Sequence, residues 1–339
     1  MFAENNQKTI ALSIAIPTYR RHQLLMDTLD SVVSQRPGFD FEVLVLDNEC
    51  SLDLKTRVES FAQSITVPLR YLSVEAIGLH NGRNTGAQLS SGDIIVYIDD
   101  DVIAPQGWLE NICQPFLDPA VGGVGGRTLP RWESPPPNWV KALEPSFFSL
   151  LDLGSETRAM TESELPYGCN MAFRRDLVVK LGGFPPDGVG GGWIEWRRGD
   201  GETGFARKVK QAGHVIMYSA EGWLYHRIPL SRQSFKFIRH RAMKSAVSGS
   251  YTKARQHNLS RSELLKDTFS NTKGLIKATI AWVVYSLCPR QARVDREIEL
   301  VFYSVSLLYT LRLIVDQSLR QWVSQNSYSV IGSTSQMES

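Results

Sequence analysis

The sequence predicts an α/β protein, with a mostly parallel, mixed sheet flanked by helices and a helical extension at its C-terminal end. Over about the first hundred residues, short apolar segments alternate with amphipathic ones, as in folds built from successive strand–helix units. The apolar segments are hydrophobic without interruption, which is typical of strands that helices cover on both faces. Further apolar segments of helical length return near the C-terminal end.

Strands and helices are expected to alternate before residue 100. The strands are predicted at 9–16, 41–46, 69–74 and 93–98, and the helices at 21–35, 52–63 and 78–92. The first strand ends at Pro17, which has no N–H to donate to a sheet. In the first helix, the apolar residues Leu25, Leu29, Val32 and Val33 share one face, so they are expected to face the sheet.

The regular alternation weakens after about residue 120, and Pro135–Pro137 opens a long irregular stretch. The later elements are predicted as a helix at 202–212, a strand at 215–219, a basic helix at 234–247 and two apolar segments at 274–288 and 300–315.

These elements suggest one domain and an appendage. The domain is expected over 1–230, in two halves at about 9–120 and 121–230. A basic and apolar helical extension would follow at 231–324. The tail 325–339 is rich in Ser and Gln and is expected to be disordered.

Charge is distributed unevenly along the chain. Residues 1–226 contain 20 Lys and Arg against 28 Asp and Glu, whereas residues 227–297 contain 15 against 4. Because the net charge of the whole chain is only +2, no nucleic-acid partner is expected. A basic extension beside an acidic body favours a polyanionic or membrane surface as partner.

The cysteines and the N-terminal residues bear on the cellular compartment. The four cysteines form no CxxC pair, which argues against a disulfide framework or a zinc knuckle and favours a reducing compartment. Residues 1–8 are polar and lack the basic and long apolar regions of a signal peptide. We therefore expect the chain in the cytoplasm.

Polar clusters follow three of the predicted strands at the point where each ends. They are Pro17-Thr18-Tyr19-Arg20, Asp47-Asn48 and Asp99-Asp100-Asp101. In open α/β sheets, ligands bind beyond the carboxyl ends of the strands. The three clusters are therefore expected to converge on one edge of the sheet.

The triplet Asp99-Asp100-Asp101 is the strongest candidate for chemistry. Three adjacent carboxylates repel one another unless a cation or hydrogen-bond donors neutralise them. Hard oxygen ligands suit Mg²⁺ or Mn²⁺, which also bind diphosphates. The alternative is a solvated acidic turn or a helix cap. The position after a buried strand favours a metal–nucleotide role.

Four further positions each allow a functional and a structural interpretation. Asp47 could accept a hydrogen bond from a nucleobase or form an Asx-turn. Arg83 offers forked donors to phosphate but could lie on a helix surface. A carboxylate in Gly199-Asp200-Gly201-Glu202 could be a general base or only favour a helix N-terminus. His226 could be structural, or it could join a metal shell if it faces the triplet.

Several segments of the chain match one known family in order and spacing: Ile16–Arg20, Val45–Asn48, Gly82–Gly86, Tyr97–Asp101, Gly168–Arg174, Gly182–Phe184, Gly201–Glu202 with Ala212–Gly213, and Tyr225–His226. Through them the chain resembles glycosyltransferase family 2, the inverting enzymes with a GT-A fold, which is Rossmann-like. The resemblance covers about residues 10–230. It implies a nucleotide-sugar half at about 9–120 and an acceptor and base half at 121–230.

The resemblance also implies roles for individual residues. The nucleotide-sugar donor, expected to be a UDP-sugar, would be bound by Pro17, Thr18, Tyr19, Arg20, Asp47, Arg83, Asn84, Asp99 and Asp100. The metal, Mn²⁺ or Mg²⁺, would be held by Asp101, Asp99 and His226. Among the donor residues, Asp47 would read the base and Arg83 would approach the nucleotide.

The predicted catalytic base departs from the family pattern. The family usually has Glu-Asp before this helix, with the Asp as the base. Counting back from Ala212-Gly213 places Gly201-Glu202 there, so Glu202 is the preferred base and Asp200 the alternative. Glu202 would take the proton from an acceptor hydroxyl that attacks the anomeric carbon, with inversion.

Other classes of protein fit the sequence less well. No glycine-rich loop follows the first strand, which argues against a nucleotidyltransferase or a dinucleotide-dependent oxidoreductase. A non-catalytic nucleotide-sugar-binding or membrane scaffold protein of the same fold would be expected to lack the triplet or the base. We therefore expect an enzyme of polysaccharide or glycoconjugate biosynthesis.

The C-terminal segments leave two interpretations open. The apolar segment 274–288 contains Lys277, and 300–315 contains Arg312; both are shorter than the roughly 20 residues of a spanning helix. They could pack on the catalytic domain or lie in a membrane interface. We expect peripheral membrane contact through 231–315 and a saccharide or lipid-linked acceptor.

Overall fold

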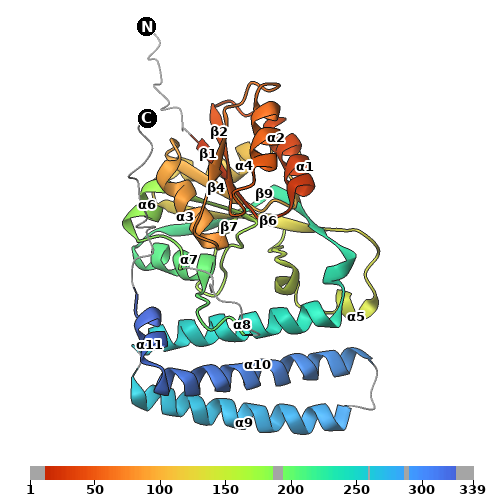
Figure 1. Cartoon of the computed structure of the whole chain (residues 1–339), viewed down its shortest axis with the longest axis vertical. Helices are drawn as coiled ribbons and strands as arrows, with labels where there is room; N and C mark the ends of the chain where they lie inside the picture. Colours follow the sequence, from red (N-terminus) through yellow and green to blue (C-terminus); the bar gives the residue numbers. More distant parts are fainter. Residues whose placement is uncertain (1–11, 186–193, 259, 286–289, 326–339) are drawn as a thin grey trace.

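The computed structural model describes residues 12–185, 194–258, 260–285 and 290–325 of the 339-residue chain. A sheet flanked by helices forms one part of the molecule, and long C-terminal helices form a layer beneath it (Figure 1). The fold class predicted from the sequence is confirmed.

The alternating elements expected in the first hundred residues all form. They are β1 (Leu12–Thr18), α1 (His22–Val33), β2 (Phe41–Asp47), α2 (Leu52–Ala62), β3 (Leu69–Ser73), α3 (Leu79–Leu89) and β4 (Ile94–Ile98). β1 pairs in parallel with β2 and β4, and β2 pairs in parallel with β3. The carboxyl ends of β1, β2 and β4 therefore meet at one edge.

The remaining strands complete a mixed sheet. The elements after β4 are β5 (Val102–Ile103), α4 (Trp108–Cys113), η1 (Gln114–Leu117), β6 (Val121–Trp132), α5 (Asn138–Lys141), η2 (Pro145–Phe148), β7 (Arg158–Ala159), β8 (Asn170–Arg174), α6 (Arg175–Lys180), α7 (Gly201–Gln211) and β9 (Val215–Ile228). The strand order is β3-β2-β1-β4-β8-β6-β9-β5, and β7 pairs with β9. β8 is antiparallel to both β4 and β6.

The sequence did not predict β5, β6, β7 or β8 as strands, and it predicted β9 only in part. β6 contains two Gly-Gly pairs, which the sequence analysis did not interpret as a strand; a Cβ at Gly123 would lie 2.6 Å from the Phe173 ring. β9 was expected only over 215–219 but continues to Ile228. The continuation passes Gly222, where a Cβ would lie 2.9 Å from the backbone of Ile112, so only glycine allows α4 to pack there.

Helices cover both faces of the sheet, as the uninterrupted apolar strands predicted. On one face, side chains of α1, α2 and α4 pack on the sheet, including Leu29, Val58 and Trp108. On the other face, α3, α6 and α7 contribute Ala87 and Phe205, among others.

The C-terminal layer contains longer helices than the sequence suggested. After η3 (Leu230–Arg232), the chain forms α8 (Phe235–Gln256), α9 (Arg261–Tyr285), α10 (Arg290–Val315) and α11 (Gln317–Val323). α10 lies between α8 and α9 (Figure 1). The apolar segments 274–288 and 300–315 fall within α9 and α10, apart from residues 286–288, which lie outside the described residues. Apart from Gln325, the tail 325–339 also lies outside them.

The expectation that both apolar segments are too short to span a membrane needs a correction for α10. In the described part of the chain, one helix, Arg293–Val315, is long and apolar enough to cross a membrane by length and composition. Polar residues before position 300 continue the same helix, so the apolar segment alone understated its length. One face of α10 is occupied, since Val305, Tyr309 and Leu313 are buried in the core that α10 shares with α8.

Candidate active site

The acidic triplet lies between β4 and β5, on a turn whose backbone is fixed from two sides. Thr28 Oγ1 on α1 donates to the carbonyl of Asp100 at 2.9 Å. The Arg227 N–H on β9 donates to the carbonyl of Asp101 at 2.9 Å. Asp100 and Asp101 are buried, whereas the Asp99 side chain is partly exposed. The turn therefore presents three carboxylates in fixed positions.

Three guanidinium groups balance the three carboxylates. Arg83 Nη2 lies 3.2 Å from Asp99 Oδ1, and Arg232 Nη2 lies 2.8 Å from Asp101 Oδ2. Arg21 Nη1 lies 3.0 Å from Asp100 Oδ1 and 3.0 Å from Asp101 Oδ2. The repulsion expected within the triplet is thus offset by arginines from three separate parts of the chain.

Thr18, at the end of β1, contacts the triplet directly. Its Oγ1 donates to Asp100 Oδ2 at 2.7 Å. Burial raises the pKa of Asp100 to about 6; the charges of Asp101 and Asp99 add to this effect, and Arg21 and Thr18 oppose it. The first and fourth strands therefore meet at this carboxylate.

Asp99, Asp101 and His226 form a group that could hold a metal ion. One potential ligand atom of each lies within 4.8 Å of those of the other two. His226 is positioned by β9, where it pairs with Val102 of β5. Its Nδ1 lies 2.8 Å from the carbonyl oxygen of Phe148. A carbonyl only accepts, so Nδ1 carries a proton, and in the neutral ring Nε2 presents its lone pair to the triplet.

The residues fit a divalent cation. Asp101 Oδ1 is buried, makes no hydrogen bond and lies 3.2 Å from Nε2 of His226. Burial alone would favour protonation of Asp101, but the neighbouring His226, Arg232 and Arg21 hold its pKa well below the ordinary value. A buried carboxylate oxygen without a donor, next to an imidazole lone pair and a second carboxylate, suits Mn²⁺ or Mg²⁺.

Glu202 joins this group through Arg83. Nη1 of the buried Arg83 lies 3.4 Å from Glu202 Oε2, while its Nη2 contacts Asp99. Nε2 of His80, on α3, lies 3.4 Å from the same Glu202 oxygen. Gly201 allows this approach, since a Cβ there would lie 2.1 Å from His80 Nε2, and its φ is +49°. The start of α7 therefore brings a carboxylate beside the triplet.

Asp200 has a different set of partners. Its Oδ2 accepts from Thr252 Oγ1 on α8 at 2.8 Å and lies 3.5 Å from Arg207 Nη1. Burial raises its pKa. Asp200 is the N-cap residue of α7 by position, but its side chain makes no capping hydrogen bond. Its carboxylate joins α7 to α8 instead.

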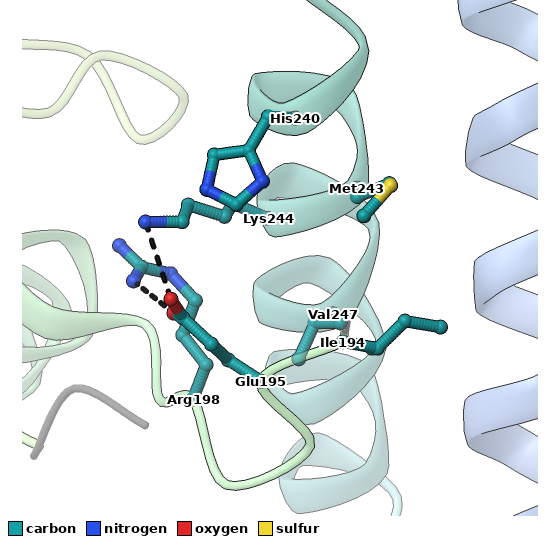
Figure 2. A pocket seen from close by; sticks show the side chains of 7 residues that line it. All are labelled: Ile194, Glu195, Arg198, His240, Met243, Lys244 and Val247. Atoms are coloured by element: carbon teal, nitrogen blue, oxygen red, sulfur yellow. Dashed lines mark hydrogen bonds and ion pairs between the residues drawn. The ribbon is translucent and has the colours of Figure 1, made fainter. Parts of the chain in front are cut away.

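The segment before Glu202 is held along α8, as Figure 2 illustrates. Glu195 lies 3.1 Å from Nη1 of Arg198 and 3.3 Å from Nζ of Lys244. Ser248 Oγ donates to the carbonyl of Gly199 at 2.9 Å. The cavity between these elements measures only about 10 Å³, which is room for about one water molecule. We interpret it as a packed junction that positions Glu202.

Asp47 and Asn84 are engaged in local structure at the same edge. Asp47 accepts hydrogen bonds from the N–H groups of Glu49 and Ser51, each at 2.8 Å, and from Tyr71 Oη at 2.7 Å. Asn84 exchanges two hydrogen bonds with the backbone of Phe184, at 2.8 and 3.1 Å. Both side chains therefore shape the edge of the sheet.

The cluster Pro17-Thr18-Tyr19-Arg20, at the carboxyl end of β1, divides into inward and outward residues. Pro17 packs on α3, where a Cβ at Gly82 would lie 3.3 Å from its Cβ. Tyr19 is 45% exposed, and the Arg20 guanidinium lies 5.0 Å above its ring. Arg20 also pairs with Glu49 at 3.3 Å. Tyr19 and Arg20 are thus available to a ligand at this edge, whereas Thr18 is committed to Asp100.

Three residues that the sequence analysis did not select complete the site. They are Arg21, His80 and Arg232. Arg21 directly follows the cluster at the end of β1, so its position was a usable signal. His80 and Arg232 carried no comparable signal, because their partners lie 122 and 131 positions away.

The fold and the residues at this edge define a glycosyltransferase with a GT-A fold. The chain belongs to glycosyl transferase family 2, whose family model matches residues 13–182.

Relatives and solved structures agree with this assignment. The chain is 26% identical over 241 residues to a glucosyl-dolichyl phosphate glucuronosyltransferase of Haloferax volcanii, covering 67% of this chain and 72% of the relative. It is 24% identical over 240 residues to the succinoglycan biosynthesis protein ExoM of Rhizobium meliloti, covering 70% and 74%. The fold resembles that of mannosyltransferase PcManGT from Pyrobaculum calidifontis, solved with GDP-Man and Mn²⁺, with a TM-score of 0.59, 18% identity, and 92% and 89% of the two chains covered. The chain is thus a glycosyltransferase of glycoconjugate biosynthesis.

Proposed function

We propose that the chain transfers a sugar, with inversion, from a nucleoside-diphosphate donor to a hydroxyl of a saccharide or lipid-linked acceptor. One observation carries this proposal: Arg83 contacts both Asp99, in the candidate metal group, and Glu202. A metal-bound diphosphate and a general base would therefore lie on adjacent sides of one reaction centre. The base role is assigned to Glu202 rather than Asp200, since Asp200 is buried against Thr252 and Arg207.

The residues divide the chemistry between leaving group and acceptor. A divalent ion held by Asp99, Asp101 and His226 would stabilise negative charge on the departing nucleoside diphosphate. Glu202 takes the proton of the acceptor hydroxyl while that oxygen bonds to the anomeric carbon. The bond from that carbon to the diphosphate oxygen breaks, and its electron pair leaves with the nucleotide.

Arg83 and His80 position the Glu202 carboxylate for this proton transfer. The buried guanidinium of Arg83 favours the ionised carboxylate, which is the form that accepts a proton. Arg83 Nη1 also lies 3.3 Å from His80 Nδ1, which then accepts and leaves Nε2–H to face Glu202. These two contacts limit the positions that the carboxylate adopts.

The donor is assigned to the edge formed by β1, β2 and β4. Tyr19 and Arg20 are exposed there. Asp47 Oδ1 accepts a hydrogen bond from the N–H of Glu49, and its second lone pair leaves acceptor capacity for a nucleobase N–H. Thr18, Asp100, Asn84 and Pro17 would shape this donor site. We assign a UDP-sugar as the donor, with Mn²⁺ or Mg²⁺ as the cofactor.

The acceptor is assigned to the side of the sheet that carries Glu202. On this proposal, residues 1–230 form the catalytic domain, with the nucleotide-sugar half at about 9–120 and the acceptor half at 121–230. Within the extension 231–324, residues 231–315 would hold the enzyme on the cytoplasmic face of a membrane. This location fits a lipid-linked acceptor.

The surface of α9 supports the membrane assignment. Six large apolar side chains recur along its outer side and are more than half exposed: Leu265, Phe269, Ile276, Ile280, Val283 and Val284. Lys266, Lys273 and Lys277 are interspersed among them and are also exposed. Lys273 Nζ lies 4.2 Å from the centre of the Phe269 ring. An apolar helix face with interspersed lysines is typical of helices that lie in an anionic membrane interface.

A donor screen tests the proposal. Purified full-length chain with Mn²⁺ is incubated with a panel of UDP- and GDP-sugars, and release of the nucleoside diphosphate is measured. We expect release from at least one UDP-sugar, and less of it from the Asp47→Ala variant. Turnover of GDP-sugars alone would contradict the assignment of a UDP-sugar as the donor. If no donor is turned over when an acceptor lipid extract is present, the proposed function is wrong.

A further inference from the structure

Two groups compete for the lone pair on Nε2 of His226, namely the Arg232 guanidinium and a bound metal ion. Nδ1 donates to the carbonyl of Phe148, so the neutral ring has a single acceptor position, at Nε2. Arg232 Nη1 lies 3.0 Å from Nε2, and a guanidinium only donates. The hydrogen bond from Arg232 and coordination of a metal ion by His226 are therefore mutually exclusive.

Arg232 also contacts a second proposed metal ligand. Its Nη2 lies 2.8 Å from Asp101 Oδ2, which Arg21 contacts at 3.0 Å as well. Thus one guanidinium engages both Asp101 and His226, while Asp101 Oδ1 remains without a hydrogen bond. If a metal ion binds Asp101 Oδ1 and His226 Nε2, Arg232 can keep its contact with Asp101 Oδ2 but loses its hydrogen bond to His226.

The position of Arg232 allows its side chain to change partners without disturbing the sheet. It lies in η3, the short turn that joins β9 to α8, and its side chain is 18% exposed. The guanidinium lies 6.0 Å from the centre of the Phe237 ring on α8, so this aromatic ring borders it. Rotation of the side chain alone would release Nη1 from His226.

We infer that Arg232 couples the binding of the metal ion to the binding of the donor diphosphate. This inference rests on the proposed function of the site. A metal ion alone displaces the Arg232–His226 hydrogen bond and leaves two positive groups close together, which opposes binding. A diphosphate brings anionic oxygens that accept from the released guanidinium and bind the ion. Each ligand therefore binds more tightly in the presence of the other.

Binding measurements on the full chain test this coupling without any turnover. The Kd of Mn²⁺ alone is measured from the electron paramagnetic resonance signal of free Mn²⁺. The Kd of UDP is measured by calorimetry in saturating Mn²⁺ and in excess EDTA, with GDP in parallel. The ratio of the two nucleotide constants is the coupling factor, which is reciprocal between the two ligands.

Arg232→Gln removes the charge but keeps a side chain of similar shape. In this variant we expect Mn²⁺ alone to bind about threefold to tenfold more tightly, and the coupling factor to fall by about tenfold. Arg232→Lys should retain part of the coupling. Arg239→Gln is the matched control: Arg239 belongs to the same basic segment but lies on α8 and pairs with Glu297 on α10, so it should leave both quantities unchanged. Thermal unfolding of each variant verifies that it folds.

The outcomes separate this inference from the proposed function. If wild-type chain binds Mn²⁺ but Arg232→Gln has the wild-type coupling factor, the inference is wrong and the metal site stands. Weaker binding of Mn²⁺ alone by Arg232→Gln would also overturn it, since Arg232 would then support the ion rather than compete with it. If the wild-type chain binds no Mn²⁺ even in the presence of saturating UDP, the inference and the metal assignment both fail.

Discussion

Arg83 and Glu202 meet across 119 positions of the sequence, with Nη1 of Arg83 3.4 Å from Oε2 of Glu202. The same guanidinium reaches Asp99, so the candidate base and the candidate metal group share one buried cation. This relationship places the proton acceptor and the leaving group of the proposed reaction around a single rigid residue. It also ranks the two candidate bases, since the carboxylate of Asp200 contacts Thr252 and Arg207 instead.

The first prediction concerns the base. Glu202→Gln keeps the size of the side chain but removes its ability to accept a proton, so turnover should fall by about 10² to 10⁴-fold. The affinity for the nucleotide should change little, because the triplet is intact. Asp200→Asn should reduce turnover less, since its partners Thr252 and Arg207 lie on helices behind the site.

Steady-state rates and nucleotide Kd values for both variants check this prediction. A larger loss of turnover in Asp200→Asn than in Glu202→Gln would reverse the assignment of the base while leaving the enzyme class intact.

The second prediction concerns Asp100 and pH. Burial raises its pKa from 3.8 to about 6, so ionising it in the folded chain opposes folding. Its contribution to stability is fully present below the unfolded pKa, near 4, and is lost as pH rises through about 6. The difference is at most about 3 kcal/mol. Relative to Asp100→Asn, the wild-type chain should therefore lose stability between pH 4 and pH 7.

Urea unfolding in EDTA at several pH values measures this difference, since EDTA removes cations that would favour the ionised triplet. Asp40→Asn changes an exposed carboxylate and serves as the control. A stability difference between wild type and Asp100→Asn that does not vary with pH would show that burial of Asp100 has no such effect.

The third prediction concerns Asn84, which was predicted to bind the donor. Its amide exchanges two buried hydrogen bonds with the backbone of Phe184. Asn84→Ala should therefore lower the free energy of unfolding by about 2–4 kcal/mol. Asn81→Ala, one turn earlier on α3, removes only a bond to the Ile77 carbonyl near the surface and should cost less than about 1 kcal/mol. Equal stabilities of the two variants would indicate that the Phe184 contacts contribute little.

The fourth prediction concerns the outer face of α9. Replacing Ile276, Ile280 and Val284 together by serine should reduce binding to anionic vesicles by at least about tenfold, because their burial in the interface is lost. These residues are exposed, so the fold should be retained. A matched control replaces Leu52, Leu117 and Val179, which are equally exposed but lie on the catalytic domain.

Co-sedimentation with phosphatidylglycerol vesicles at low salt measures binding. If wild-type chain stays in solution, or if the two triple variants bind alike, the membrane assignment is wrong and the C-terminal helices serve only as packing elements.

The N-terminal half of the fold was predictable because its signals are local. β1, β2 and β4 are short apolar segments that end at a polar residue or directly before one, and parallel pairing brings those ends together without further information. Thr18 and Asp100 were both selected, and they make a direct hydrogen bond. By contrast, β6 has a glycine-rich sequence without a local strand signal, and its Gly123 leaves room for the Phe173 ring of the neighbouring β8, which only the fold reveals.

The partners of the acidic triplet were only partly predictable. Arg83 was selected from its place in a motif, but Arg232 comes from a basic segment in which it is one of 15 Lys and Arg residues. Nothing local distinguishes it from Arg239, which instead pairs with Glu297 on α10. The choice between Asp200 and Glu202 likewise depended on which carboxylate faces Arg83, and that is a property of the packing of α3, α7 and α8.

The most direct test of the central claim is whether turnover of the donor requires a divalent ion held by Asp101. Release of nucleoside diphosphate is measured with Mn²⁺, in excess EDTA and after Mn²⁺ is added back, for wild type and for Asp101→Ala. We predict release by wild type only when Mn²⁺ is present, recovery when it is restored, and a loss of at least about 10²-fold in Asp101→Ala. Full release in excess chelator, or by Asp101→Ala, would contradict the account.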